Sequence, residues 1–453
     1  MIGYALVMVA GLAGVVSLAR PFIGVIAFAV LSLLNLQVAF PELGQTHASL
    51  YLGVMIAAGA LVSRQQGGLR IGVPALFLAV LLAWLGFGTL FAPDRAVALS
   101  VFVSTAKRML FALLLLFIIR DKRQLFAFLL ALVACGCANA VISVIQNSRR
   151  VYDVIGQREV IIEGSGLYHD SNYFILALVP LIPIAYFLFF RRKTGRVVRA
   201  YSLFGGAAVA IMSLGIVSSY SRTGFLALVA VFAFIAIRER RRVMTYLIGI
   251  IFAVAAIIVL PHEYWEKVHG IVEHKDSSSI GRLMIMGEAI RLMLLNPVVG
   301  VGIGNLGEAI REDPRSPAAI RGINKAHNEY LQLGAEGGMV ALSLFCAYLF
   351  VAIRSAGQAV RVSRDATVAR VATGIWIALA STMVILLFLS AANSDVLWIV
   401  LILPFVVRQV AMNDNGKQGE VKVAAIQHAA GRGRVKVAVA DVRSVAQCRL
   451  GSR

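Results

Sequence analysis

Residues 326–351 read AHNEYLQLGAEGGMVALSLFCAYLFV, a polar opening that is followed by a long apolar run. A helix from His327 to Val351 would be about 37 Å long at 1.5 Å per residue, and the hydrocarbon core of a bilayer is roughly 30 Å thick. The stretch therefore predicts a membrane-spanning helix with His327 just outside the apolar slab. Histidine can take or give a proton near neutral pH, so the two interpretations are chemistry at the membrane surface and simple capping of the helix.

Apolar runs of roughly bilayer length recur along most of the chain. The 453 residues are 59% hydrophobic and only 15% charged, with a mean hydropathy of +0.83, whereas soluble domains are about 25% charged. The composition predicts an all-α polytopic membrane protein, and the absence of alternating segments excludes an outer-membrane barrel. We expect twelve membrane helices, or thirteen if every candidate spans, from the segments 2–19, 22–37, 49–63, 72–92, 97–119, 125–147, 171–190, 201–217, 224–238, 243–260, 328–353, 368–390 and 396–411.

The formal charge of +20 is explained mainly by topology, and we expect no nucleic-acid partner. Basic clusters at 120–123, 191–193 and 238–242, and the basic tail after Met412, fall on one side if the spans alternate. By the positive-inside rule that side is the cytoplasm. The first helix has no cationic leader, so we interpret it as a mature helix rather than a cleaved signal.

This alternation predicts four parts along the chain. Residues 1–260 form the N-terminal transmembrane helices, 261–326 a periplasmic loop or cap, 327–411 the C-terminal transmembrane helices, and 412–453 a basic, loosely ordered cytoplasmic tail. Shorter segments at 38–48, 148–169, 218–223 and 391–395 join the cap on the outer side.

The cap contains one clear helix signal. The serines at 277–279 favour a helix start, and Asn296-Pro297 favours a stop. Arg282 and Arg291 are nine positions apart and so lie on opposite faces of this helix. We place Arg282 in its first turn, where a cation is disfavoured unless an anion binds there.

Polar residues at the membrane edge are candidates for the site. Arg222 lies in a short polar break at 219–224, and its planar fork of donors suits phosphate oxygens. Asp170 and Asn172 lead into another span, where each could simply cap the helix. Lys107 and Arg108 lie inside an apolar run, and because intramembrane cations usually face a cavity or a partner, we expect one of them to line a cavity.

The helix that follows His327 gives a further set. On a helical wheel His327 and Tyr330 share one face with Gly334, whereas Glu329 and Glu336 point elsewhere. The glycines on that face would let a lipid tail or a helix approach closely.

Several other motifs are absent from the sequence. There is no Walker A motif and no HExxH, and the glycine run at 300–304 is interpreted as a tight turn after the Arg282 helix. Cys135-Gly136-Cys137 does not match a zinc or redox pattern. We therefore expect no metal and no cofactor.

Three motifs together carry a family resemblance: Ser221-Arg222-Thr223-Gly224, the segment from Gly281-Arg282 to Gly302, and His327-Asn328-Glu329-Tyr330-Leu331. In this order and spacing they resemble the O-antigen ligase/polymerase family of bacterial envelope glycosyltransferases. The resemblance covers roughly positions 200 to 350, with a looser match at 166–180, and the first 95 residues and the tail carry none.

The resemblance implies a GT-C-like fold and transfer of a glycan from undecaprenyl diphosphate, on the periplasmic side of the inner membrane. In the family, arginines matching Arg222 and Arg282 hold the donor diphosphate, and a histidine matching His327 activates the acceptor. The residues support these roles, since arginines can meet the charge of a diphosphate leaving group and neutral histidine suits a base. The long outer loop, with its several cationic residues, would suit phosphorylated lipid A-core as the acceptor, with membrane lipids around the helices.

Other functions stay open from sequence. An O-antigen polymerase or a protein O-oligosaccharyltransferase would use the same lipid-linked donor and the same motifs. A transporter of lipid-linked sugars would also use intramembrane cations but would not require His327 beside Arg282. An intramembrane protease lacks support, because no nucleophile motif accompanies the histidine.

Overall fold

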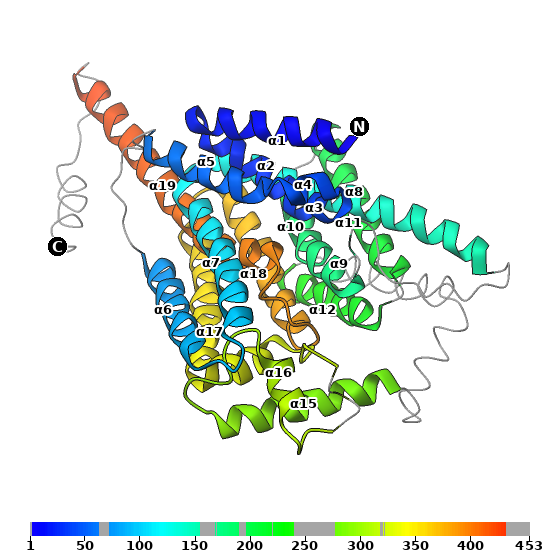
Figure 1. Cartoon of the computed structure of the whole chain (residues 1–453). Helices are drawn as coiled ribbons and strands as arrows, with labels where there is room; N and C mark the ends of the chain where they lie inside the picture. The colour runs from blue at the N-terminus through cyan, green and yellow to red at the C-terminus, as the bar shows by residue number, and fades with distance from the viewer. Residues whose placement is uncertain are drawn as a thin grey trace.

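The computed structural model describes residues 2–62, 72–154, 168, 170–189, 196–219, 221–239, 277–317, 320 and 322–431. Across these residues the regular elements are helices, most of them gathered in one bundle (Figure 1). The predicted span 243–260 and the first part of the cap, 261–276, lie outside the described residues. The all-α class is therefore confirmed.

The helices follow the predicted apolar runs closely. Their bounds are α1 Ile2–Ala19, α2 Pro21–Leu33, α3 Leu36–Ala39, α4 Pro41–Gln45, α5 Ala48–Val62, α6 Val73–Gly88, η1 Thr89–Phe91, α7 Arg95–Ile118, α8 Lys122–Val154, α9 Ser171–Leu178, α10 Leu181–Phe189, α11 Arg196–Ser218, α12 Arg222–Arg238, α15 Ser277–Leu295, α16 Leu306–Glu312, α17 Glu329–Val362, α18 Ala366–Ile385 and α19 Asp395–Gly431. Within the described residues, eight helical segments are long and apolar enough to cross a membrane. The polytopic architecture is confirmed, whereas the count of twelve stays a prediction.

The centre of the bundle is built from α17, α18 and α19, which pack against one another, with α7 against α19 and α10 against α18. The predicted span 171–190 is two helices, α9 and α10, because the chain turns at Val179-Pro180. Proline has no N–H to donate to the preceding turn, so it interrupts the helical ladder. The α9–α10 segment is nonetheless the most buried of the eight, since 83% of its apolar 18-residue stretch is buried inside the protein.

One end of the bundle collects the segments predicted to be cytoplasmic. Lys122 at the start of α8 pairs with Asp365 at the start of α18. Arg370 in α18 lies 3.7 Å from Glu239, the residue that follows α12. These contacts bring the basic segment 120–123 and the end of α12 at Arg238 to the same end of the bundle.

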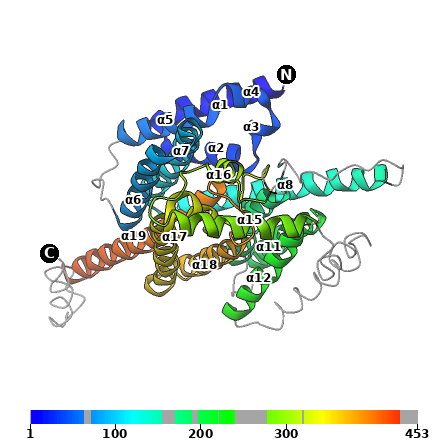
Figure 2. The ribbon, with the colours of Figure 1, turned by 60° about the horizontal axis from the view of Figure 1, so that its bottom comes forward.

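The opposite end carries the beginning of α17 and the cap helices. The amide of Glu329 donates to the carbonyl of Leu386 at the end of α18, over 2.8 Å. Helix α15 lies across this end, near α16 and the start of α17 (Figures 1 and 2). The polar start of α17 is therefore far from the basic end.

Helix α17 is broken at Gly338, whose φ of 73° and ψ of 179° are not helical. The carbonyl of Ala335 accepts the amide of Val301 instead of that of Met339, over 2.8 Å, and Met339 donates to Pro297, also over 2.8 Å. A loop segment thus replaces one turn of the helical ladder. Such irregular backbone is tolerated at membrane depth where protein covers it.

The glycines of the 300–304 run allow this insertion. A Cβ on Gly300 would lie 2.5 Å from the backbone carbon of Glu336, and one on Gly302 would lie 2.5 Å from the Cβ of Ala92. The run forms turns directly after α15, as predicted, and these turns are packed between α7 and α17.

Of the glycines in α17, Gly338 receives this loop, because a Cβ there would lie 2.1 Å from the carbonyl oxygen of Val298. Gly334 instead lies against Met293 of the neighbouring helix α15, where a Cβ would come within 2.6 Å of the sulfur, so the predicted close approach of a helix is confirmed there.

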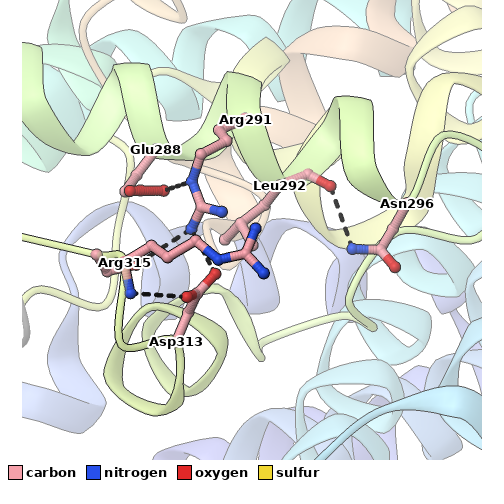
Figure 3. A network of polar contacts seen from close by, with 7 residues as sticks. Glu288, Arg291, Leu292, Asn296, Asp313 and Arg315 are labelled. Carbon is pink, nitrogen blue, oxygen red and sulfur yellow. Dashed lines mark hydrogen bonds and ion pairs between the residues drawn. The ribbon is translucent and has the colours of Figure 1, made fainter.

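The described part of helix α15 runs from Ser277 to Leu295 and ends directly before Asn296-Pro297, as the stop signal predicted. Arg291 ties it to the rest of the cap (Figure 3), donating to Glu288 over 2.5 Å and to Asp313 over 2.7 Å. These carboxylates raise the pKa of Arg291. The pKa of Asp313 is lowered, first by the backbone amide of Arg315 and then by Arg291.

The C-terminal tail departs from the prediction of loose order. Helix α19 continues to Gly431, well past Met412. Residues 417–431 are rich in Lys, Glu, Gln, Val and Ala, and several of these are strong helix formers. Positions beyond 431 lie outside the described residues.

Candidate active site

His327 immediately precedes the N-cap of α17 and has a left-handed backbone with a φ of 51°. Asn328 caps the helix, because its side chain accepts the amide of Leu331 over 3.1 Å. The amide of Ala326 is held by the side chain of Gln332 over 2.7 Å. A left-handed non-glycine residue costs on the order of 1–3 kcal/mol, and such strain clusters at functional sites.

Three charged residues lie close enough to His327 to act on its ionisation. Burial lowers the pKa of His327, Arg282 lowers it further, Asp170 opposes this, and Lys325 adds to the lowering. The net effect is a pKa below the ordinary value, so the imidazole is neutral near pH 7 and able to accept a proton. The structure thus brings Arg282, Asp170 and His327 together from three distant parts of the sequence.

Arg222 is the first residue of α12 and lies at the same end of the bundle. The far end of α12 contacts the start of α18 through Glu239 and Arg370. Arg222 therefore lies toward the end of α18 that contacts Glu329. Its helix also packs closely on α9, since a Cβ on Gly224 would come within 3.0 Å of Ile175.

Arg282 lies five residues after Ser277, the first described residue of α15, and is therefore beyond the first turn of the helix. Our placement of Arg282 in the first turn was wrong. The argument that a cation there requires a bound anion is therefore weaker, because the effect of the helix dipole is confined to the first turn. The structure agrees with the argument that Arg282 and Arg291 lie on opposite faces of the helix. Arg291 pairs with Glu288 and Asp313 within the cap, whereas the charge of Arg282 acts on His327.

Asp170 and Asn172 divide their roles. The Asp170 side chain caps α9 by accepting the amide of Asn172 over 2.7 Å, and its charge also reaches His327. Asn172 is buried in the first turn of α9. His169 lies outside the described residues.

The two intramembrane cations of α7 differ. Lys107 is exposed, and the expectation that Lys107 or Arg108 lines a cavity stays a prediction. Arg108 turns inward and pairs with Asp395 at 3.1 Å, and its Nη1 donates to Ser104 over 2.8 Å. Asp395 is also held by Ser32, over 2.8 Å. Arg108 thus finds a partner, which is the other usual solution for a cation in a membrane helix.

Tyr330 does not face His327. Its hydroxyl donates to the carbonyl of Met383 over 3.1 Å, and its ring lies 6.1 Å from that of Phe345. The helical wheel failed here because it was drawn from His327, whereas the helix begins at Glu329 and His327 has a left-handed backbone.

Two carboxylates that the sequence interpretation placed away from the His327 face are buried and hydrogen-bonded. Glu329 accepts the amides of Ala391 and Ala392, the latter over 3.0 Å. Glu336 accepts the side-chain amide of Gln332 over 2.5 Å. A glutamate within an apolar run is costly and needs an internal partner, and that signal could have identified both.

The described residues contain no group of three or more His, Cys, Asp and Glu suited to a metal ion. What they do gather is a neutral histidine, an arginine from the cap helix and a carboxylate that tunes the histidine. Chemically this set can bind an anion beside a base.

A family model described as O-antigen ligase matches residues 207–346. This stretch belongs to the O-antigen ligase family. The resemblance is confirmed, and the matched stretch contains Arg222, Arg282 and His327. The family implies a glycosyltransferase-like enzyme in a multi-pass bacterial membrane protein.

A second family model, described as a family of unknown function (DUF5935), matches residues 1–194. The N-terminal helices, where we found no resemblance over the first 95 residues, thus share their sequence pattern with other chains. A comparison with curated proteins finds no match.

Proposed function

We propose that this chain transfers a glycan from undecaprenyl diphosphate to a sugar hydroxyl of lipid A-core, at the periplasmic face of the bacterial inner membrane. The observation that carries the proposal is the convergence of His327 and Arg282 at one end of the bundle, within the family-matched stretch.

In this proposal Arg222 and Arg282 bind the donor diphosphate. Guanidinium groups match pairs of phosphate oxygens, and they stabilise the negative charge that grows on the diphosphate as it leaves. The reaction then needs no resident metal, since the energy is stored in the donor.

His327 acts as the base. The acceptor hydroxyl attacks the anomeric carbon of the donor glycan while its proton passes to His327. The bond between that carbon and the diphosphate oxygen breaks, and undecaprenyl diphosphate leaves with the electron pair. The lowered pKa of His327 favours this role, because the imidazole is neutral before the reaction.

A polymerase or a protein O-oligosaccharyltransferase would use the same donor and base, and differ only in the acceptor. A transporter is less well supported, because transport needs no base beside the anion-binding arginine.

The test is reconstitution of the purified protein in lipid with undecaprenyl-diphosphate-linked glycan. Lipid A-core, a second donor molecule and a peptide are offered separately as acceptors, and the product is identified by its mass. We expect a glycan–lipid A-core product. A product with only the second donor or the peptide would assign the alternative acceptor, and no product would contradict glycosyl transfer.

Variants separate the roles. His327→Ala should lose transfer by a factor of about 10²–10⁴ yet still bind the donor. Arg222→Ala and Arg282→Ala should lose donor binding as well, and Arg→Lys should restore it only partly, because a point charge does not copy the fork. Arg311→Ala is the matched control, since Arg311 is an exposed cap arginine paired with Glu308. Equal losses at Arg311 would contradict a specific anion site.

A further inference from the structure

A cavity of about 180 Å³ lies between α7, the start of α17 and the segment that joins α18 to α19. Lys325 and Glu329, the residues two before and two after His327, both line it. The charge of Lys325 acts on His327 and on Glu329. The cavity is therefore next to the proposed base.

The lining of the cavity mixes apolar and polar side chains, and hydrogen bonds hold several of the polar ones in place. Ser390 donates to the Oε1 of Gln332 over 3.1 Å, and the Nε2 of Gln332 donates to Glu336. Glu329 is 2% exposed and its described bonds, from Ala391 and Ala392, both use Oε2. The carboxylates of Glu329 and Glu336 are thus fixed on one wall of the cavity. The Oε1 atom of Glu329 accepts neither the amide of Ala391 nor that of Ala392.

Thr105 of α7 supplies an independent observation on the opposite wall. It is 1% exposed and lines the cavity, and its hydroxyl has no hydrogen-bond partner among the described residues. Among the described residues the buried hydroxyl of Ser213 also lacks a partner, but Ser213 does not line this cavity. A buried hydroxyl elsewhere in the bundle, that of Thr382, donates to the carbonyl of Ala378 over 2.8 Å. A buried polar group without a partner, facing a cavity, points to a ligand that supplies one.

The volume of the cavity and its lining residues limit the kind of ligand that it can bind. The volume corresponds to roughly six waters at about 30 Å³ each, and it is below the roughly 300–1,000 Å³ of sites for drug-sized ligands. It suits a single ring rather than an oligosaccharide. Sugar hydroxyls both donate and accept, so they match a wall that offers carboxylate acceptors, the side-chain amide of Asn393 and the hydroxyl of Thr105.

We propose that this cavity binds one sugar ring of the acceptor, with Thr105 and Glu329 contacting its hydroxyls so that a neighbouring hydroxyl faces His327. The proposal rests on the proposed function and adds the acceptor subsite to it. Thr105 is a binding residue in this view, and it does not take part in proton transfer.

The test is a conservative change that a structural role would tolerate. Thr105→Val keeps the shape of the side chain and removes the unpaired hydroxyl, so the fold should be as stable as the wild type or more so. The matched control is Thr382→Val, the same change at an equally buried hydroxyl outside the cavity. Binding of lipid A-core and of undecaprenyl-diphosphate-linked glycan is measured separately, by native mass spectrometry of the full chain in detergent.

We expect Thr105→Val to weaken lipid A-core binding by about fivefold to tenfold, the loss of one hydrogen bond, with donor binding unchanged and a thermal midpoint no lower than that of the wild type. Thr382→Val should bind both lipids as the wild type does. Weaker binding of the donor alone, unchanged binding of both lipids, or a wild type that does not bind lipid A-core would overturn the acceptor subsite. Binding is measured without turnover, so the two proposals can fail separately. If Thr105→Val had the expected effect on lipid A-core binding but the wild type showed no transfer, the proposed function would be contradicted and the binding subsite would still be supported.

Discussion

A left-handed backbone and a lowered pKa meet at one residue, His327. The sequence predicted that this residue is a candidate base at the membrane edge, because a histidine there precedes a long apolar run. It also predicted Arg282 as its companion through the family motifs. It could not predict that Glu329 and Glu336 are buried and hydrogen-bonded, since their direction depends on where the helix begins and on which loop supplies their hydrogen bonds.

The residue-scale prediction concerns pH. If His327 is the base, kcat/KM should rise with pH through a group whose pKa lies below the ordinary histidine value, because burial and Arg282 favour the neutral form. Asp170→Asn removes a carboxylate that raises this pKa, so the acid limb should move to lower pH while the cap on α9 is kept. Lys325→Gln removes a cation that lowers it, so the limb should move to higher pH.

The measurement is the pH profile of transfer by each variant, with Arg311→Gln as the control that leaves the limb in place. Shifts of Asp170→Asn and Lys325→Gln in the same direction would mean that His327 does not set the acid limb. An unmoved limb in both would mean the same.

At the scale of elements, the sequence was most reliable where local signals suffice. Asn296-Pro297 correctly predicted the end of α15, because proline acts on the helix within a few residues. The break of α17 was missed, although Gly337-Gly338 inside an apolar run was the available signal. The break depends on a loop some forty residues earlier in the chain, and helical periodicity does not report such a partner.

The element-scale prediction tests this break. Gly338 has a φ that side chains rarely adopt, and a Cβ there would lie 2.1 Å from the carbonyl oxygen of Val298. Gly338→Ala should therefore destabilise the protein by at least about 2 kcal/mol, through backbone strain and overpacking. We expect a lower thermal midpoint in detergent and loss of transfer, because the loop that shapes the site is displaced.

Gly357→Ala is the control in the same helix. A Cβ at Gly357 would meet no atom within 4 Å, and alanine favours a helix, so this change should be neutral or stabilising by up to about 1 kcal/mol. If Gly338→Ala were as stable as Gly357→Ala, the inserted loop would not depend on the glycine.

At the scale of the whole molecule, the basic clusters and the candidate site lie at opposite ends of the bundle. Alternation of the apolar runs predicted that separation, since each span carries the chain to the other side. The number of spans could not be derived in the same way, because apolar helices of 13 to 18 residues such as α1, α2 and α5 are near the lower limit of a bilayer crossing. Composition alone does not distinguish a short span from a helix that lies in the interface.

The last prediction tests the orientation of these two ends. In a chain whose four native cysteines are replaced by serine and whose transfer activity is retained, Glu312→Cys places one thiol at the exposed end of α16, and Arg364→Cys places one in the exposed turn before α18. By the positive-inside rule the Arg364 end is cytoplasmic. Intact cells with a permeable outer membrane should therefore label Glu312→Cys with an impermeant maleimide, and Arg364→Cys only after the inner membrane is opened. The reverse labelling pattern would place His327 and Arg282 on the cytoplasmic side of the membrane. A lipid-linked donor that has been flipped to the periplasmic side could not reach them there, and the proposed reaction would be contradicted.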